Sequence, residues 1–320
     1  VVAEKHPAAL LGCYAYSDYS HPHSFKLHSN VFLQTTTAFR RTSLTLGEQL
    51  DLLKARLSRI GIREYYSVYQ WDWDGPRPGR VQPAQLQKDL RFFADKGVSS
   101  VNAEASNNWG PRGLGYYVAS HLMWDVNADV PGLLADFYEK AFGPAARSVE
   151  RYYARWYGSS ALAVREKSNV PDELNNEDRT VAVAVKDLQA AFRDLDEAAR
   201  LVRDQPAFLA RVNHLRLYLH YLVLRHELDE AARQGNEQAI VEAIRGETRF
   251  AGRLAYSNVI HARPILGKAF LRRFKAFEKL LAQTPEAQQE SKGWRQVGEM
   301  PSTQEIEQLW AADRQSLSVR

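Results

Sequence analysis

The chain has 320 residues, about twice the usual size of a domain, so we expect two domains. Its net charge of +4 is spread over interspersed acidic and basic residues, which argues against a nucleic-acid partner. A single cysteine excludes an intramolecular disulfide, and no apolar run is long enough to predict a membrane span.

The first residues, VVAEKHP, are typical of the end of a helix, and neither an initiator methionine nor a signal peptide is present. We therefore expect Val1 to follow a cut, with any export signal upstream of it.

The first 125 residues alternate strand-like with helix-like patterns. Apolar and β-rich runs predict strands over 10–16, 30–37, 62–69 and 98–103. The first of these runs is LLGCYAY, which is typical of a buried parallel strand and predicts that Cys13 packs in the core.

Helices are predicted between these strands. Apolar residues at spacings of three and four extend over 46–60, with Thr45 and Glu48 as a capping box and Gly61 at the end. A second helix begins at Pro83 and closes at Gly97, and a third is expected over 114–124.

Alternating strands and helices predict parallel strands with helical crossovers, in a doubly wound sheet or a barrel. No glycine-rich phosphate fingerprint follows any strand, which argues against a dinucleotide-binding fold. The long polar and aromatic links after the first and third strands favour a (β/α)8 barrel, with residues 1–128 as the barrel part.

From about residue 130 the strand patterns end, and an antiparallel helical bundle over 129–320 is predicted. Apolar residues repeat at helical spacing over 181–202, 208–222 and 270–281. Breaks are expected near 205–206, 235–236 and 263–264. We expect an interdomain loop over 168–179 and a loose hydrophilic tail from Thr284 to about Ile306.

Three loops that follow predicted strands share one composition, rich in aromatic, acidic, amide and imidazole groups. In a barrel these loops converge on one rim. They contain Tyr14, Tyr16, Asp18, Tyr19, His21 and His23 in the first; Gln70, Trp71, Asp72, Trp73 and Asp74 in the second; and Asn102, Glu104, Asn107, Asn108 and Trp109 in the third.

This composition fits a carbohydrate site, because sugars present flat C–H faces to aromatic rings and hydroxyls to polar groups. Glycosidic cleavage needs two carboxyl groups across the bond. Glu104 is the first candidate for one of them, with Asp72 and Asp18 next. The candidate substrate contacts are Tyr14, Tyr16, His21, His23, Trp71, Trp73, Asp74, Asn102, Asn107 and Trp109.

Each candidate also has a structural explanation. The aromatic residues can be packing residues, and Asp72 or Asp74 can cap a turn before Gly75. Glu104 can form an ion pair with a residue such as Arg112.

Histidines give no strong metal motif. His21, His23 and Asp18 lack a third anchor at a recognised spacing, so we expect no metal and no cofactor. His214, His220 and His226 recur every six residues and do not share a helix face, which predicts interface or surface positions.

The run GLGYYVASHLMWDVNADVPGLLADFYEKAFGPAARSVERYY over 113–153 resembles the bacterial DUF4838 family. The segments HPAALLGCYAY, NVFLQ and RVNHLRLYLHYLVL are also similar to it. Members of this family are similar to glycoside hydrolases and are placed among TIM barrels with a helical domain. The resemblance implies that Trp124–Asp125 and Phe142–Gly143 fix the junction between barrel and bundle.

The resemblance further implies an exported, carbohydrate-active bacterial protein whose N-terminal half of the barrel precedes residue 1. The four strands would then be barrel strands five to eight, and the family supplies no catalytic pair to carry over. The open sheet edges of such a half-barrel predict poor solubility or self-association.

The favoured function is hydrolysis of a polysaccharide or oligosaccharide by carboxylate acid/base catalysis. The first alternative is a non-catalytic carbohydrate-binding protein on the same fold. The second is a helical interaction module with a barrel remnant, which would expose an apolar stripe on the bundle.

Overall fold

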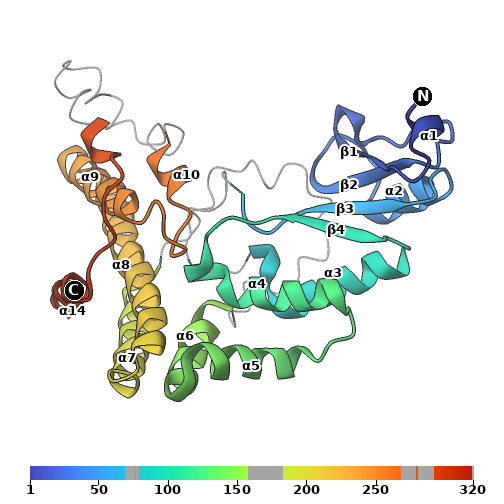
Figure 1. The fold of residues 1–320 in the computed structure, drawn as a ribbon. Helices are drawn as coiled ribbons and strands as arrows, with labels where there is room; N and C mark the ends of the chain where they lie inside the picture. The colour runs from blue at the N-terminus through green and yellow to red at the C-terminus, as the bar shows by residue number, and fades with distance from the viewer. Residues whose placement is uncertain (69–75, 77–78, 158–182, 268–278, 280–291, 319–320) are drawn as a thin grey trace.

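A computed structural model describes residues 1–68, 76, 79–157, 183–267, 279 and 292–318. The chain forms a four-stranded parallel sheet with crossover helices, followed by a part made of helices alone (Figure 1). None of the helices in these residues is long and apolar enough to cross a membrane.

The strands are β1 (Leu11–Ser17), β2 (Val31–Arg40), β3 (Ile60–Tyr65) and β4 (Ser100–Glu104). They lie side by side in chain order, and every neighbouring pair is parallel. All four predicted strands are therefore confirmed, with ends shifted by a few residues.

The helices α2 (Leu46–Lys54), α3 (Pro83–Asp95) and α4 (Trp109–Trp124) belong to the sheet part, and α3 and α4 lie below the sheet in Figure 1. Their apolar side chains form one core with those of the strands. Three short elements complete this part: α1 (Val2–Lys5), η1 (Asp18–Ser20) and η2 (Gly79–Val81).

Side chains of a strand alternate between two faces, so the sheet has a helix-covered face and an open face. Ala15, Leu33 and Ile62 point into the helix-covered core. Ile62 has Arg63 next to it in β3, and Arg63 therefore lies on the open face together with its register partner Asn102. The open face is polar and aromatic.

The end of α2 differs from the prediction. The capping box of Thr45 and Glu48 is confirmed, but the helix ends at Lys54, and Gly61 lies inside β3. A Cβ on Gly61 would approach Phe32 to 2.8 Å, so the glycine serves close packing on the sheet rather than a helix end. The predicted start of α3 at Pro83 is confirmed, and Gly97 follows it with φ +78°.

The prediction that β1 is a buried strand is wrong. Leu11 to Tyr14 are exposed, including Cys13, which was expected in the core. In the described structure β1 has a neighbouring strand on one side only, so its apolar residues are left at the margin of the helix layer.

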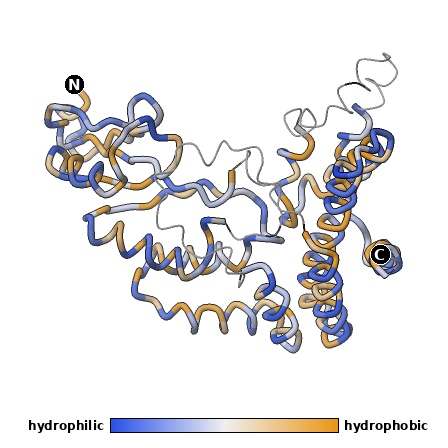
Figure 2. Tube along the Cα trace, turned by 180° about the vertical axis from the view of Figure 1, so that it is seen from behind, coloured by the Kyte–Doolittle hydropathy of each residue, from blue (hydrophilic) through white to orange (hydrophobic). Residues whose placement is uncertain are grey.

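The second part consists of helices around the long helix α8 (Pro206–Gln234), which packs against α4, α5, α7, α9 and α14. Its other elements are α5 (Val130–Phe142), η3 (Gly143–Ala145), α6 (Ala146–Tyr157), α7 (Val185–Leu201), α9 (Glu237–Arg253), α10 (Ala262–Leu266) and α14 (Thr303–Ser318). Figure 2 shows hydrophobic residues recurring along these helices, as the sequence spacing predicts.

Two of the three predicted breaks are confirmed. Pro206 begins α8, and Gly235 ends it in a left-handed conformation with φ +67°. The third break, at 263–264, lies inside α10, because the chain leaves α9 at Arg253 and turns over 254–261 instead. The predicted loop 168–179 and the apolar positions of the segment 270–281 lie outside the described residues.

The tail is more packed than predicted. Trp294 is buried, with the guanidinium of Arg245 4.8 Å from its ring centre. The amide of Gly298 donates to the carbonyl of Gly252, so the residues before α14 are attached to the end of α9.

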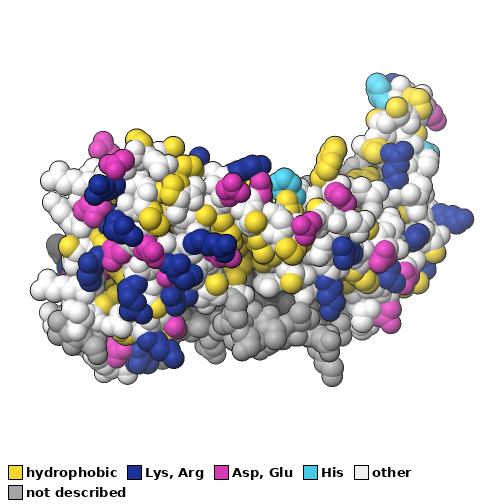
Figure 3. All heavy atoms as spheres, turned by 90° about the horizontal axis from the view of Figure 1, so that it is seen from below, with side chains coloured by type: hydrophobic (Ala, Val, Ile, Leu, Met, Phe, Trp, Pro, Cys, Tyr) yellow, Lys and Arg dark blue, Asp and Glu magenta, His cyan; other side chains and the backbone are white. Residues whose placement is uncertain are grey.

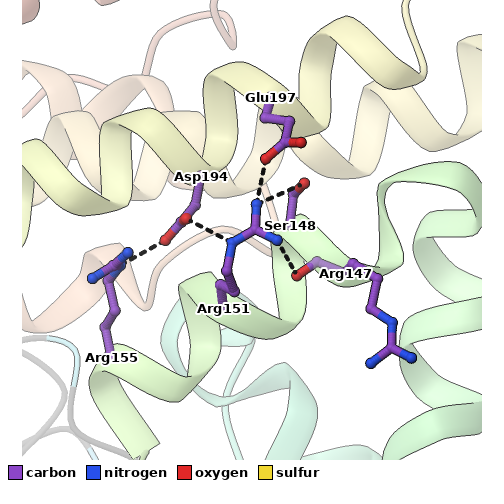
Figure 4. A network of polar contacts seen from close by, with 6 residues as sticks. All are labelled: Arg147, Ser148, Arg151, Arg155, Asp194 and Glu197. Carbon is purple, nitrogen blue, oxygen red and sulfur yellow. Dashed lines mark hydrogen bonds and ion pairs between the residues drawn. The ribbon is translucent and has the colours of Figure 1, made fainter.

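Polar contacts join α6 to α7 (Figure 4). Asp194, which is nearly buried, accepts from Arg151 Nε at 3.2 Å and from Arg155 Nε at 2.6 Å. Arg151 also pairs with Glu197 and donates to Ser148. Elsewhere on the surface, seen from below in Figure 3, acidic and basic side chains are interspersed.

The two expected junction motifs have different outcomes. Trp124 is 93% exposed at the end of α4 and makes no packed junction, so that expectation is wrong. Phe142 is buried, and a Cβ on Gly143 would approach the ring of Phe208 in α8 to 2.6 Å. The Phe142–Gly143 corner therefore packs inside the helical part, and its expected role at the junction stays a prediction.

Candidate functional site

The open face of the sheet carries a polar cluster around Arg63 in β3. Arg63 donates from Nη2 to Glu104 Oε2 at 2.8 Å and from Nη1 to Asn102 Oδ1 at 2.7 Å. The Glu104 side chain is 40% exposed and that of Arg63 22%. Glu104 and Asn102, which the sequence singled out separately, are thus held by one guanidinium.

The ion pair of Glu104 differs from the expected one. Arg63 binds Glu104, whereas the expected partner, Arg112, donates to the backbone carbonyl of Tyr66. The reason is strand alternation: Arg63 and Glu104 project from neighbouring strands on the same face, and Arg112 lies one turn into α4.

Tyrosines surround this cluster. The guanidinium of Arg63 lies 6.0 Å from the ring centre of Tyr14 and 5.5 Å from that of Tyr65. Tyr14 and Tyr16, both predicted site residues, are 49% and 43% exposed. The pKa of Tyr65 is raised to about 12, mainly by burial and to a smaller extent by the neighbouring Tyr16. This phenol therefore remains protonated at neutral pH.

The backbone is strained where β1 and β2 end beside these rings. Ser17 and Phe39 have φ of 52° and 57°, uncommon for residues with a side chain, and the register of the two strands shifts there. The Phe39 ring contacts Tyr16 and Tyr65, with ring centres 6.1 and 5.3 Å away. Such strain persists only where the surrounding contacts hold it.

The first loop turns partly away from the cluster. Asp18 pairs with Arg41 at 2.7 Å, and both side chains are about 70% exposed. His21 is exposed, and the His23 ring stacks on Phe25 with centres 5.5 Å apart. Asp18, His21 and His23 form no hydrogen bond or ion pair with Glu104, so they stay candidates by their place at the end of β1.

The second loop lies outside the described residues, and with it Gln70, Trp71, Asp72, Trp73 and Asp74. Its flanks are described, and they contain an ion pair that the sequence did not reveal. Glu64 at the end of β3 accepts from Arg80 Nε at 2.7 Å and Nη2 at 3.0 Å, and from Thr37 Oγ1 at 2.6 Å. Burial is the largest single influence on the pKa of Arg80 and lowers it, but Glu64, Asp89 and Tyr66 together raise it by more, so the net shift is upward.

The third loop is attached to the helical part. The side-chain amide of Asn107 donates to the carbonyl of Ser257, and the backbone amides of Trp109 and Gly110 donate to Asn258 and Val259. Asn107 therefore connects the third loop to the helical part. Trp109 is 45% exposed, with its ring edge-on to Tyr116 at 5.5 Å.

Sequence reasoning missed Arg63 and Tyr65, although the pattern that places them is visible. In IREY, Ile62 points to the core, and period-two alternation then puts Arg63 and Tyr65 together on the opposite face. Their partners come from β1 and β4, and pairing between distant strands is not encoded locally.

The bundle histidines lie at interfaces. His220 Nδ1 lies 2.8 Å from Asp313 of α14, and its ring is edge-on to Phe250. His226 is also buried. The contacts of His220 explain it structurally and agree with the interface position expected for it.

Comparison with known proteins gives one family. Residues 1–155 match the family described as "Domain of unknown function (DUF4838)". No curated protein and no solved structure matches the chain.

Proposed function

Because this chain belongs, through residues 1–155, to the DUF4838 family, whose function is unknown, we propose its function from the residues on the open sheet face. We propose a glycoside hydrolase that acts on a polysaccharide or oligosaccharide. The supporting observation is that Glu104, Asn102 and Tyr14 meet around Arg63.

The architecture that suits this function is the C-terminal half of a (β/α)8 barrel followed by an antiparallel bundle. In a barrel, the sheet face opposite the helices lines the interior. Arg63 and Glu104 lie near the carboxyl ends of their strands, where the site of such a barrel is built, and this position supports the assignment. The other half of the barrel would then be a partner of the edges of β1 and β4.

In the proposed mechanism, Glu104 is the carboxylate that acts as nucleophile or base. Its ion pair with Arg63 fixes its position, and Asn102 would bind a sugar hydroxyl. Tyr14 and Tyr16 offer half-exposed rings to the flat faces of sugar rings. Asp72 and Asp18 are the candidates for the proton donor.

A non-catalytic carbohydrate-binding protein is the second candidate. The observation that favours it is again the ion pair, because a carboxylate neutralised by Arg63 is well placed to orient sugar hydroxyls without attacking a bond. Both functions would operate where polysaccharides are met, so we propose an exported protein.

The first test is the substitution Glu104→Gln, assayed against a polysaccharide panel for binding and released sugar together. For the hydrolase we expect loss of release with binding retained, since Gln keeps the shape but not the charge. A matched control is Glu242→Gln, because Glu242 also pairs with an arginine at 2.8 Å and is exposed, but lies in α9. Binding without release by the unchanged chain would favour the binding protein, and release unaffected by Glu104→Gln would contradict the assignment.

A further inference from the structure

An exposed tyrosine from the helical part lies beside the third loop of the candidate site. Tyr256 is 91% exposed, on the turn that follows α9. Its neighbours in sequence, Ser257 and Asn258, are the residues that accept hydrogen bonds from Asn107 and Trp109. Two exposed aromatic residues from distant parts of the sequence, Tyr256 and Trp109, thus stand on segments that are hydrogen-bonded to each other.

The attachment between the two segments is built from several contacts. The Trp109 and Gly110 amides, at the start of α4, donate to the carbonyls of Asn258 and Val259 at 3.0 and 2.8 Å. The His261 amide donates to Asn108 Oδ1 at 3.3 Å. Helix starts leave such amides unpaired, and here backbone from the helical part satisfies them.

Gly110 is the residue that permits this approach. A Cβ at this position would lie 2.5 Å from the carbonyl oxygen of Val259 and 2.9 Å from Tyr218. Any larger residue would push the two segments apart.

The turn that carries Tyr256 is itself fixed. The amide and hydroxyl of Ser257 donate to the carbonyl of Leu254 at 2.9 and 2.8 Å, and the Val259 amide donates to Ser257 Oγ at 3.2 Å. Leu254 and Val259 on either side are fully buried. Tyr256 is therefore an exposed ring on an anchored turn, so a ligand that covers it orders the side chain but does not have to order the backbone.

The distances indicate the size of ligand that would use both places. Tyr256 is two residues from Asn258, which accepts the hydrogen bond from Trp109. The backbone of Tyr256 therefore lies within about 8 Å of the backbone of Asn258. Trp109 follows Glu104 by five residues, which span at most about 18 Å. These limits leave room between Glu104 and Tyr256 for a ligand that extends beyond a single sugar ring.

We propose that Tyr256 and Trp109 form a distal subsite for an extended, neutral glycan chain whose other end lies at Glu104. This inference rests on the proposed carbohydrate function and adds to it that the helical part contributes to the site. Flat exposed rings suit sugar faces, and the near balance of 42 basic and 38 acidic residues in the chain favours no strongly ionic ligand.

The test measures affinity by calorimetry for neutral β-linked glucose, xylose and N-acetylglucosamine oligosaccharides of increasing length, using the whole chain. We expect affinity to rise with length in the unchanged chain. Tyr256→Ala and Tyr256→Leu should lower the affinity for the longest oligomers between about twofold and tenfold, while leaving that for the shortest unchanged. Tyr256→Phe should behave as the unchanged chain.

The control is Trp124→Ala, which removes another exposed aromatic ring from the opposite end of α4. If Trp124→Ala lost as much affinity as Tyr256→Ala, the proposed subsite would be overturned. It would also be overturned if affinity still rose with oligomer length in Tyr256→Ala and Tyr256→Leu. If no oligosaccharide binds the unchanged chain, the proposed carbohydrate function itself fails. If folded Tyr256 variants lost affinity for short and long oligomers alike, Tyr256 would not act as a distal subsite.

Discussion

Glu64 illustrates a residue whose importance comes from burial. Its side chain is 2% exposed, and it accepts hydrogen bonds from Arg80, Thr37 and the amide of Tyr65. Because Glu64 is the last residue but one of β3 and Arg80 lies in η2, the pair joins the two flanks of the second loop. A charge in such a place is stable only while its partner is present.

We predict that Glu64→Gln destabilises the fold by about 3 kcal/mol, the lower end of the range for breaking a buried pair, since Arg80 keeps some contact with water. Urea unfolding of the whole chain measures this. The control is Asp51→Asn, which breaks the exposed pair with Lys96 and should cost less than about 1 kcal/mol. Equal costs for the two substitutions would contradict the assigned burial of Glu64.

The individual site residues were predictable to different degrees. Glu104, Asn102, Tyr14 and Tyr16 stand out because polar and aromatic residues end apolar strands, and the structure places them on one face. Arg63 was missed because a single arginine in a strand has no meaning until its neighbours are known. Tyr256 gave no indication at all, since an exposed tyrosine on a turn is ordinary in sequence.

At the scale of elements, α14 is held to α8 by charged contacts along its length. Arg216, whose side chain is 3% exposed, pairs with Glu307 and has the Trp310 ring centre 4.5 Å from its guanidinium. The pKa of Glu307 is lowered, mainly by the hydrogen bond from Arg216 and further by the positive charge of Arg216. This carboxylate thus stabilises the docked helix only while it is ionised.

We predict that Glu307→Gln lowers stability by about 1–2 kcal/mol at pH 7, between the values for exposed and buried pairs. Because the folded pKa is lowered, this difference should persist above the ordinary glutamate value of about 4.3 and disappear as the pH falls through the lower folded value. Urea unfolding at several pH values between neutrality and mild acid measures it.

The control for this pH dependence is Glu150→Gln, whose exposed contact with Arg147 within α6 should contribute little at any pH. A stability difference for Glu307→Gln that stays constant down to strong acid would exclude the proposed role of its charge.

Helix ends were more predictable than helix docking. Thr45, Glu48, Pro83 and Gly235 act through neighbours within four residues, whereas Arg216 and Glu307 are 91 residues apart.

At the scale of the whole molecule, β1 presents an unpaired edge in the described structure, with Leu11 and Tyr14 about half exposed. Exposed edges with apolar side chains pair readily with other strands. We predict concentration-dependent self-association of this chain in size-exclusion chromatography with light scattering. Leu11→Lys should reduce it, because a charge on the edge opposes pairing.

The matched control is Leu52→Lys, which places the same charge on the exposed surface of α2, where Leu52 is 38% exposed. It should leave self-association unchanged. A chain that stays monomeric at all concentrations, or equal effects of both lysines, would show that the β1 edge is protected in solution.

The sequence by itself determined the local structure: the order of strands and helices, most of their starts and stops, and the change from a sheet part to a helical part. These follow from hydrophobic periodicity, caps, proline and glycine, whose effects act over a few residues. It also determined family membership over residues 1–155. Only the tertiary structure decided that Glu104 pairs with Arg63, that β1 is exposed, and that the turn 254–261 attaches to the start of α4. The physical reason is that strand neighbours, burial and contacts between distant segments depend on how the whole chain packs.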